Sequence, residues 1–85
     1  MTDKERNDYV NHCDLECTKD VTTVRKGAGC EEGQIYWFEY VHDTGDDNEH
    51  PDADAFYRKL SDNTHYDEVF ITDEELKNNF IRKPW

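Results

Sequence analysis

The stretch 34-QIYWFEYVH-42 decides the fold, because it carries the strongest strand signal in the chain. Aromatic and β-branched residues dominate it, and both kinds favour extended backbone. Successive side chains of a strand point to opposite faces, so the apolar residues divide into two sets: Ile35, Trp37 and Val41 on one face, and Tyr36, Phe38 and Tyr40 on the other. A strand that is apolar on both faces is expected at the centre of a sheet, with helices packed on one face and partial cover on the other.

The residues before this strand predict a helix, a strand and a loop. Thr2 and Glu5 fit a capping box, in which each side chain accepts a hydrogen bond from the other residue's backbone amide, so a helix is expected over residues 3–13. The β-branched run at residues 21–24 predicts a strand. Three of the four glycines fall within residues 25–33 and predict a loop there.

The residues after the central strand predict two further helices and one further strand. After a polar loop at 43–50, Pro51 occupies a favoured first helical position and apolar residues follow at helical spacing, which predicts a helix over 51–61. Residues 65–71 predict a strand. Thr72 and Glu75 form a second capping box that opens a helix carrying Leu76, Phe80 and Ile81, with Pro84 ending it.

This order of elements predicts a small α+β domain spanning residues 1–85. We expect a short, mostly antiparallel sheet of about three strands, with two or three helices packed on it. The 85 residues suffice for one domain, and although hydrophobic residues make up only 34%, an aromatic content of 13% allows a compact core. No long apolar run and no secretory leader are recognisable, and an odd number of cysteines argues against a disulfide framework, so a soluble protein in a reducing cytoplasm is expected.

Acidic residues dominate the charge and are unevenly distributed. The chain holds 21 acids and 10 bases, for a formal net charge of −11. Residues 43–75 contain twelve of the acids against only two bases, whereas residues 76–85 contain three bases and no acid. The twelve acids are Asp43, Asp46, Asp47, Glu49, Asp52, Asp54, Asp62, Asp67, Glu68, Asp73, Glu74 and Glu75.

A structural explanation covers part of this cluster. Five of the twelve acids lie in the first turns of predicted helices, where the helix dipole favours carboxylates: Asp52, Asp54, Asp73, Glu74 and Glu75. The other seven have no such explanation, and clustered like charges destabilise a small domain. One explanation for these seven acids is adaptation of the protein surface to high salt. The other is that their electric field attracts a binding partner.

The charge favours a protein that imitates nucleic acid over one that binds it. A net charge of −11 disfavours direct nucleic-acid binding. Fixed carboxylates could instead occupy the Lys/Arg rows with which proteins contact the phosphate charges of DNA. Such binding would be steered electrostatically and weakened by salt.

In this character, the stretches 43-DTGDDNEHPDAD-54 and 67-DEVFITDEE-75 resemble the small acidic host-takeover and anti-defence proteins of lytic bacteriophages, several of which are DNA mimics. The resemblance implies an inhibitor, acting in the bacterial cytoplasm, that blocks the DNA-binding surface of a basic host protein. The implied targets are a histone-like nucleoid protein such as HU, followed by a restriction or CRISPR nuclease or RNA polymerase. All twelve acids are then candidate contact residues, with Tyr57, Tyr66 and Trp85 as candidate apolar contacts at the rim.

A metal-stabilised interaction domain is the alternative function. Cys13, Cys17 and Cys30, with His12 beside the first, could in principle supply four zinc ligands, although zinc modules usually present two ligand pairs on turns and only one pair is evident here. Residues 43–54 resemble a calcium loop in acidity alone. No catalytic signature is recognisable, so we expect neither enzyme activity nor a cofactor.

Overall fold

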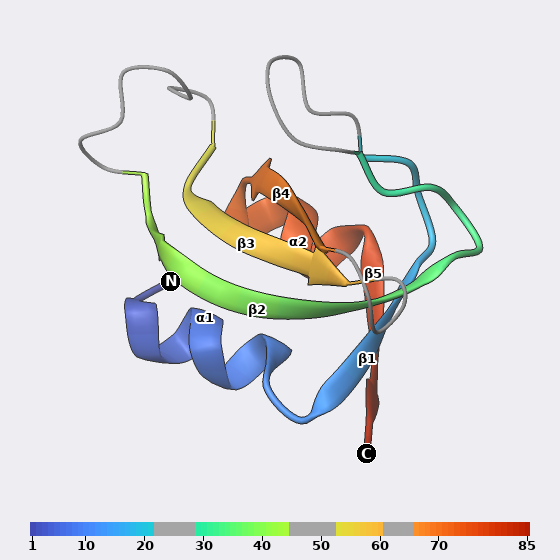
Figure 1. Ribbon diagram of the computed structural model, residues 1–85, viewed down its shortest axis with the longest axis horizontal. Coiled ribbons are helices and arrows are strands. Elements are labelled where there is room, and N and C mark those ends of the chain that lie inside the picture. The colour runs from blue at the N-terminus through green and yellow to red at the C-terminus, as the bar shows by residue number, and fades with distance from the viewer. Residues whose placement is uncertain (22–28, 45–52, 61–65) are drawn as a thin grey trace.

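A five-stranded antiparallel sheet and two short helices make up the part of the chain described by the computed structural model, which comprises residues 1–21, 29–44, 53–60 and 66–85 (Figure 1). The strands lie in the order β4-β3-β2-β1-β5, so four of them form a meander and the fifth returns to pair with the first. In chain order the elements are α1 (Asp3–Val10), β1 (Cys13–Cys17), β2 (Ile35–Asp43), β3 (Ala55–Leu60), β4 (Tyr66–Ile71), α2 (Asp73–Asn78) and β5 (Phe80–Pro84).

The predicted central strand is confirmed as β2, which lies in the middle of the sheet. It pairs with β1 at its start, where Leu15 faces Tyr36, and with β3 along the rest of its length. The register shifts between Tyr40 and His42, as at a β-bulge. The sheet is strongly curved, so β1 and β5 cross one end of β2 while β3 runs beside most of its length (Figure 1).

The predicted fold class is wrong, because the described chain contains five strands and only two short helices. Residues 55–60 of the expected helix 51–61 form β3, in which Ala55, Tyr57 and Lys59 are buried and alternate with half-buried residues. Helical and alternating patterns overlap in so short a segment. The alternation of buried and half-buried residues in β3 was not recognised from the sequence, because its buried position 59 is a lysine and lysine is rarely a core residue.

The end of the chain was also predicted as helix and is a strand. Helix α2 has its predicted capping box, with Thr72 and Glu75 each accepting from the other's amide, but it ends at Asn78. Phe80 and Ile81 therefore belong to β5, which pairs with β1 along its whole length. Pro84 ends this strand and not a helix, since pairing with β1 overrides the local helical pattern.

The start of the chain agrees with the prediction only in its first turns. The capping box at Thr2 and Glu5 is present, but α1 ends at Val10 and residues 13–17 form β1. The chain turns at His12, whose φ of 56° is the left-handed conformation common just after a helix. The strand predicted at 65–71 is confirmed as β4. Of the strand predicted at 21–24, Val21 forms an isolated bridge with Cys30, and residues 22–24 lie outside the described residues.

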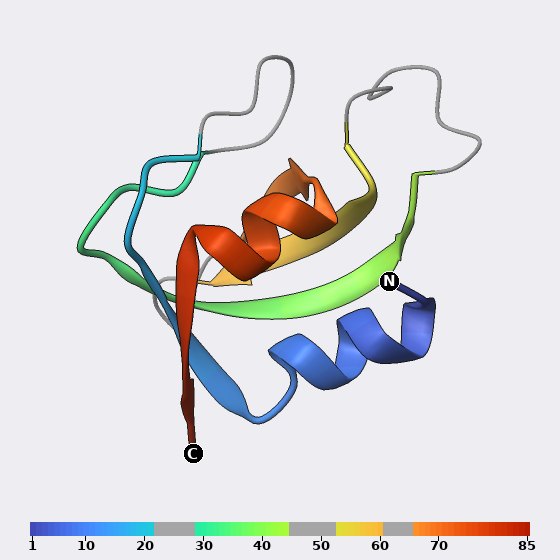
Figure 2. The same cartoon turned by 180° about the vertical axis from the view of Figure 1, so that it is seen from behind.

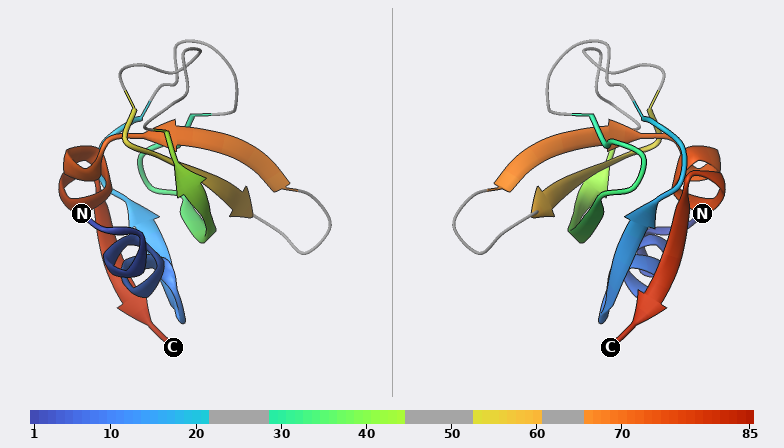
Figure 3. Two further views of the ribbon diagram at one scale, coloured as in Figure 1. Left: turned by 90° about the vertical axis from the view of Figure 1, so that its left-hand side faces the viewer. Right: turned by 90° about the vertical axis from the view of Figure 1, so that its right-hand side faces the viewer.

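Both helices lie on the same side of the curved sheet (Figures 2 and 3). The sheet face on this side, the inner face, holds most of the core. At its centre Phe38 lies with its ring 5.5 Å from that of Tyr57 and 5.3 Å from that of Phe80. The other buried apolar side chains are Val10, Cys13, Leu15, Cys17, Val21, Cys30, Tyr36, Ala55, Val69, Ile71 and Leu76. Neither helix of the described chain has the length and apolar character needed to span a bilayer.

Candidate acidic binding surface

The ends of β2 and β3 bring one group of the predicted acids together with the start of α2. The Thr44 amide donates to the Asp54 carbonyl at 3.0 Å, and the Thr44 hydroxyl donates to the Ala53 carbonyl. Asp43 and Asp54 therefore lie at the same edge of the sheet, and both are exposed. The Asp54 carboxylate accepts a hydrogen bond from the Asp73 amide at 2.8 Å, which adds the first turn of α2 to this edge.

We call this region the acidic end and define it by Asp43, Asp54, Asp73 and Glu74; it lies at the upper left of the sheet in Figure 1. Asp46, Asp47, Glu49 and Asp52 lie in sequence between Thr44 and Ala53, whose hydrogen bond fixes both ends of that segment at the acidic end. These four acids lie outside the described residues, as does Asp62. Eight of the twelve predicted acids thus belong to the acidic end or to the segment attached to it.

Four of the described acids lie at the start of α2, where carboxylates are favoured, and three of them, Asp54, Asp73 and Glu75, also make hydrogen bonds or ion pairs. Asp54 was expected at the start of its own helix, but that helix is a strand and Asp54 caps α2 instead. Glu75 accepts from the Thr72 amide at 2.9 Å and completes the capping box. Since carboxylates at helix starts stabilise the helix by themselves, these two residues do not require a partner to explain them.

Asp73, the third, is held in an ion pair between the two helices. The Arg6 Nε and Nη2 atoms contact the two Asp73 carboxylate oxygens at 2.9 and 3.1 Å, and the Met1 α-amino group lies 2.9 Å from Oδ2. Burial alone would raise the pKa of the Asp73 carboxyl, but the hydrogen bonds and charges of Arg6 and the α-amino group outweigh it and hold that pKa below its usual value. Asp73 therefore joins α1 to α2 and offers little free charge to a partner.

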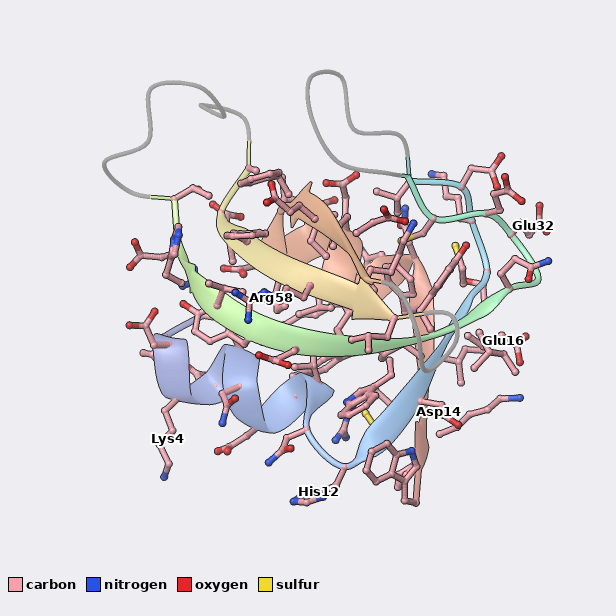
Figure 4. The ribbon with its side chains drawn as sticks, in the orientation of Figure 1. Lys4, His12, Asp14, Glu16, Glu32 and Arg58 are labelled. Atoms are coloured by element: carbon pink, nitrogen blue, oxygen red, sulfur yellow. The ribbon has the colours of Figure 1, made fainter. Side chains whose placement is uncertain are left out.

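Asp67 and Glu68 are not part of the acidic end. Both are exposed on β4, but they lie toward the end of the strand that starts at Tyr66, away from Ile71 and Asp54. In the register of β3 and β4, Asp67 lies opposite Lys59 and Glu68 opposite Arg58, and because successive strand residues face opposite sides, the two acids lie on different faces of the sheet. Arg58 also contacts the Glu39 carboxylate at 3.2 Å (Figure 4 labels Arg58). Among the residues that the structure describes, Asp67 and Glu68 therefore lie apart from the acidic end.

The cysteines lie in positions that do not suit a shared metal ion. Cys13 and Cys17 are four residues apart on one strand, which places their Cα atoms about 13 Å apart. The Cys13 Sγ donates to the Tyr9 carbonyl and the Cys17 Sγ to the Lys19 carbonyl, at 3.4 and 3.1 Å. Burial raises the pKa of the Cys30 thiol to about 12. Within the described parts of the chain no three His, Cys, Asp or Glu side chains are grouped to hold a metal ion, so the zinc alternative gains no support.

A shallow groove of about 360 Å³ lies between α1, α2 and β5, and its lining mixes both charges. Glu5 and Asp8 face Lys77 and Arg82 across it. The Arg82 guanidinium is already engaged, since its Nε donates to the Tyr9 carbonyl at 2.6 Å and it lies 5.0 Å from the centre of the Tyr9 ring. This groove therefore offers neither a dominant charge nor an activated nucleophile.

Tyr57 was expected at the rim of the binding surface, and this is wrong because its side chain is fully buried. Its hydroxyl has no hydrogen-bond partner among the residues that the structure describes. Burial strongly raises the pKa of this phenol, so it stays protonated. Trp85 is 66% exposed, and the side chain of Tyr66 lies outside the described residues.

We expect Tyr57→Phe to raise the free energy of unfolding by about 1 kcal/mol, because a buried hydroxyl without a partner loses its hydration on folding and gains nothing in return. The measurement is urea unfolding of both proteins. Tyr40→Phe is the control, since the Tyr40 hydroxyl donates to the Asp3 carboxylate and its removal should not stabilise the fold. A destabilised Tyr57→Phe variant would mean that the hydroxyl has a partner after all.

Sequence analysis missed one further surface feature. Ile35, Trp37 and Ile81 are exposed on the sheet face away from the helices, together with Trp85. The sequence contains a signal for these exposed side chains, because both faces of β2 are apolar. That pattern was interpreted to mean that other residues partly cover the second face. Ile81 was missed because its segment was predicted to be a helix.

Comparison with protein-family models, with characterised proteins and with solved structures finds no match for this chain. What the chain binds is therefore inferred from its own charge, contacts and exposed surfaces.

Proposed function

We propose that this chain is an acidic DNA-mimic inhibitor, which binds the DNA-binding surface of a basic host protein and excludes DNA from it. The observation that carries the proposal is the concentration of carboxylates at the acidic end, where the fold fixes Asp43 and Glu74 at the surface. In the sequence, Asp46, Asp47, Glu49 and Asp52 lie between Thr44 and Ala53, which are hydrogen-bonded to each other at this end of the sheet. In this proposal the protein acts in the cytoplasm of a bacterial host and has no catalytic activity.

The start of α2 explains the four described acids that were assigned to helix starts, since Asp73, Glu74 and Glu75 lie in its first turn and Asp54 accepts from the Asp73 amide. Asp54, Asp73 and Glu75 are engaged in caps or ion pairs, and Asp67 and Glu68 lie elsewhere on β4. We assign the main contact to Asp43 and Glu74, which are exposed, and to Asp46, Asp47, Glu49 and Asp52. Like charges held close together raise the free energy of the folded state, and a basic partner would relieve this repulsion.

A partner that binds DNA mainly through charge and shape suits such a surface best. Neighbouring strands lie about 4.8 Å apart, so carboxylates at strand and helix ends can be spaced densely enough to meet a row of Lys and Arg side chains that normally contact phosphates. A histone-like nucleoid protein such as HU is therefore the first target to test. A restriction or CRISPR nuclease and RNA polymerase come next.

Competition with DNA for HU, measured at stepped salt, tests the proposal. We expect this protein to displace a DNA duplex from HU at low salt and its affinity to fall steeply as salt rises. The test variant is Asp43→Asn, Asp46→Asn, Asp47→Asn and Glu49→Gln combined, which should weaken binding by roughly 1–3 kcal/mol, mainly through slower association. The same variant should melt at an equal or slightly higher temperature, because repulsion is relieved.

The matched control removes the same number of charges elsewhere: Asp8→Asn, Glu31→Gln, Glu32→Gln and Asp67→Asn, all at exposed positions. It should retain most of the affinity. Equal losses in the two variants would show that net charge alone attracts the partner. A ternary complex of HU, DNA and this protein, with both affinities undiminished, would rule out the decoy mechanism for that target.

A further inference from the structure

The sheet face opposite the helices carries four exposed apolar side chains on both sides of β1. Ile35 and Trp37 project from β2, and Ile81 projects from β5 on the same face, since Ile35 and Ile81 both pair with Glu16 of the intervening β1. Trp85 follows β5, and its ring lies 5.6 Å from that of Trp37 in an edge-to-face arrangement. We call Ile35, Trp37, Ile81 and Trp85 the outer aromatic face; the four side chains are 48, 39, 52 and 66% exposed.

The charges within this face are satisfied locally. The Lys83 Nζ lies 2.6 Å from the Glu16 carboxylate, and the Trp85 indole Nε1 donates to the Asp14 carboxylate at 3.0 Å. Figure 4 shows Asp14 and Glu16 close together along β1, in the same part of the molecule. In a chain of net charge −11, the outer aromatic face is thus an apolar region whose acids already have partners.

We propose that the outer aromatic face is the interface of a homodimer, in which a second copy of this chain packs the same face against it. A basic partner is not the best match, because its Lys and Arg side chains would meet Lys83, and Asp14, Glu16 and Lys83 together carry a net charge of only −1. A second copy of this chain is the better match, because a two-fold axis brings identical patches together and requires each patch to complement itself. An apolar surface with a Lys83–Glu16 pair meets that requirement, because the lysine of one copy can face the glutamate of the other.

Repulsion between the acidic ends does not prevent this association. Asp43 lies six positions beyond Trp37 along β2, which corresponds to about 20 Å. The Debye length is about 8 Å at physiological ionic strength, so the acidic end lies more than two Debye lengths from the centre of the interface. Residues 76–85, which include β5, also contain three bases and no acid.

The exposed area indicates a weak dimer. Side chains of these sizes and exposures present on the order of 400 Å² of apolar surface. A standard interface buries about 800 Å² per partner, more than half of it apolar. The outer aromatic face can therefore form the apolar core of an interface at the small end of this class, and a dissociation constant in the micromolar range is expected.

Salt should act on the dimer in the opposite direction to the proposed partner binding. Burying apolar surface between two like-charged copies becomes easier as salt screens their repulsion. Attraction between the acidic end and a basic partner weakens under the same change. The two interactions are therefore separable in one titration, and either can fail without affecting the other.

The test is sedimentation equilibrium from about 1 to about 300 μM protein, at low and at high salt and with reductant present. We expect a monomer–dimer equilibrium that tightens with salt. Tryptophan emission should shift to the blue as the dimer forms, because both tryptophans of the chain lie in the outer aromatic face. A monomer at every concentration and salt would overturn the proposal.

The test variant is Ile35→Lys with Ile81→Lys, which should weaken dimerisation at least tenfold. It makes the net charge less negative by two, so a purely electrostatic effect would strengthen association instead. The matched control is Asn7→Lys with Asn78→Lys, which makes the same charge change at exposed positions on the two helices and should dimerise at least as well as the original chain. A dimer that persists unchanged in the isoleucine variant would place the interface elsewhere and contradict the proposal.

Discussion

Arg6→Met is expected to lower the free energy of unfolding by about 3 kcal/mol, because it leaves a partly buried carboxylate without its main partner. The Arg6 side chain is 10% exposed and that of Asp73 is 21% exposed. Methionine keeps most of the aliphatic volume of arginine, so the loss reports the paired charge and its hydrogen bonds more than packing. Urea unfolding, monitored by tyrosine and tryptophan fluorescence, measures the change.

Arg58→Met is the matched control for this prediction. Arg58 contacts Glu39 at 3.2 Å, but the two side chains are 42% and 54% exposed. Exposed ion pairs contribute about 0–1 kcal/mol, so this variant should be nearly as stable as the original chain. Similar losses in the two variants would mean that burial of the Arg6–Asp73 pair is not what makes it important.

The Arg6–Asp73 ion pair also leads us to expect that the free energy of unfolding depends on pH in the acidic range. The folded-state pKa of Asp73 lies below its unfolded value, so its contribution to stability is fully present above about pH 4 and is lost as the pH falls through the folded-state pKa. The difference in unfolding free energy between the original chain and Arg6→Met should therefore be constant near neutral pH and shrink below about pH 4. A difference that grows on acidification would contradict the lowered pKa.

The sequence predicted those elements whose signals are local. Both capping boxes depend on two side chains three residues apart, and both are present at Thr2 and Thr72. The strand β2 was identified because aromatic and β-branched residues occupy both of its faces. These signals do not depend on how distant parts of the chain meet.

The elements that were wrongly predicted depend on distant pairing. In β3, the buried Lys59 ammonium donates to the Gly29 carbonyl and lies 4.9 Å from the centre of the Tyr36 ring. Those partners come from elsewhere in the chain, so sequence alone could not identify Lys59 as an inward-facing residue. In β5, pairing with β1 brings together the two ends of the chain and imposes a strand on residues that carry a helical pattern.

The candidate site also combines features that have a local sequence signal with features that depend on the pairing of distant residues. That Asp43 and Asp54 meet follows from the β2–β3 pairing, which the sequence missed when it predicted a helix after the loop. The ion pair of Asp73 with Arg6 joins residues 67 positions apart and had no local signal. Charge density could be read from composition, whereas the subset of acids that share a surface could not.

Phe38→Ala removes the ring at the centre of the core between β3 and β5, and we expect it to lower the free energy of unfolding by about 4 kcal/mol. Phe38 is 1% exposed and contacts Tyr57 of β3 and Phe80 of β5. The sequence placed both of those partners in helices. The truncation would leave a cavity between the two parts of the sheet, and a domain of this size has only a few kcal/mol of net stability to lose.

Phe56→Ala distinguishes the strand β3 from the helix that was predicted for the same residues. If residues 51–61 were the predicted amphipathic helix, Phe56 would share its buried face with Tyr57, and its truncation would cost as much as that of Phe38. In the strand β3 these two neighbours face opposite sides of the sheet, and Phe56 is half-buried on the outer side, stacked on Phe70 with ring centres 4.7 Å apart. Loss of such a cross-strand pair costs about 1 kcal/mol. We therefore expect urea midpoints that differ widely between Phe38→Ala and Phe56→Ala, and closely similar midpoints would favour the helix over β3.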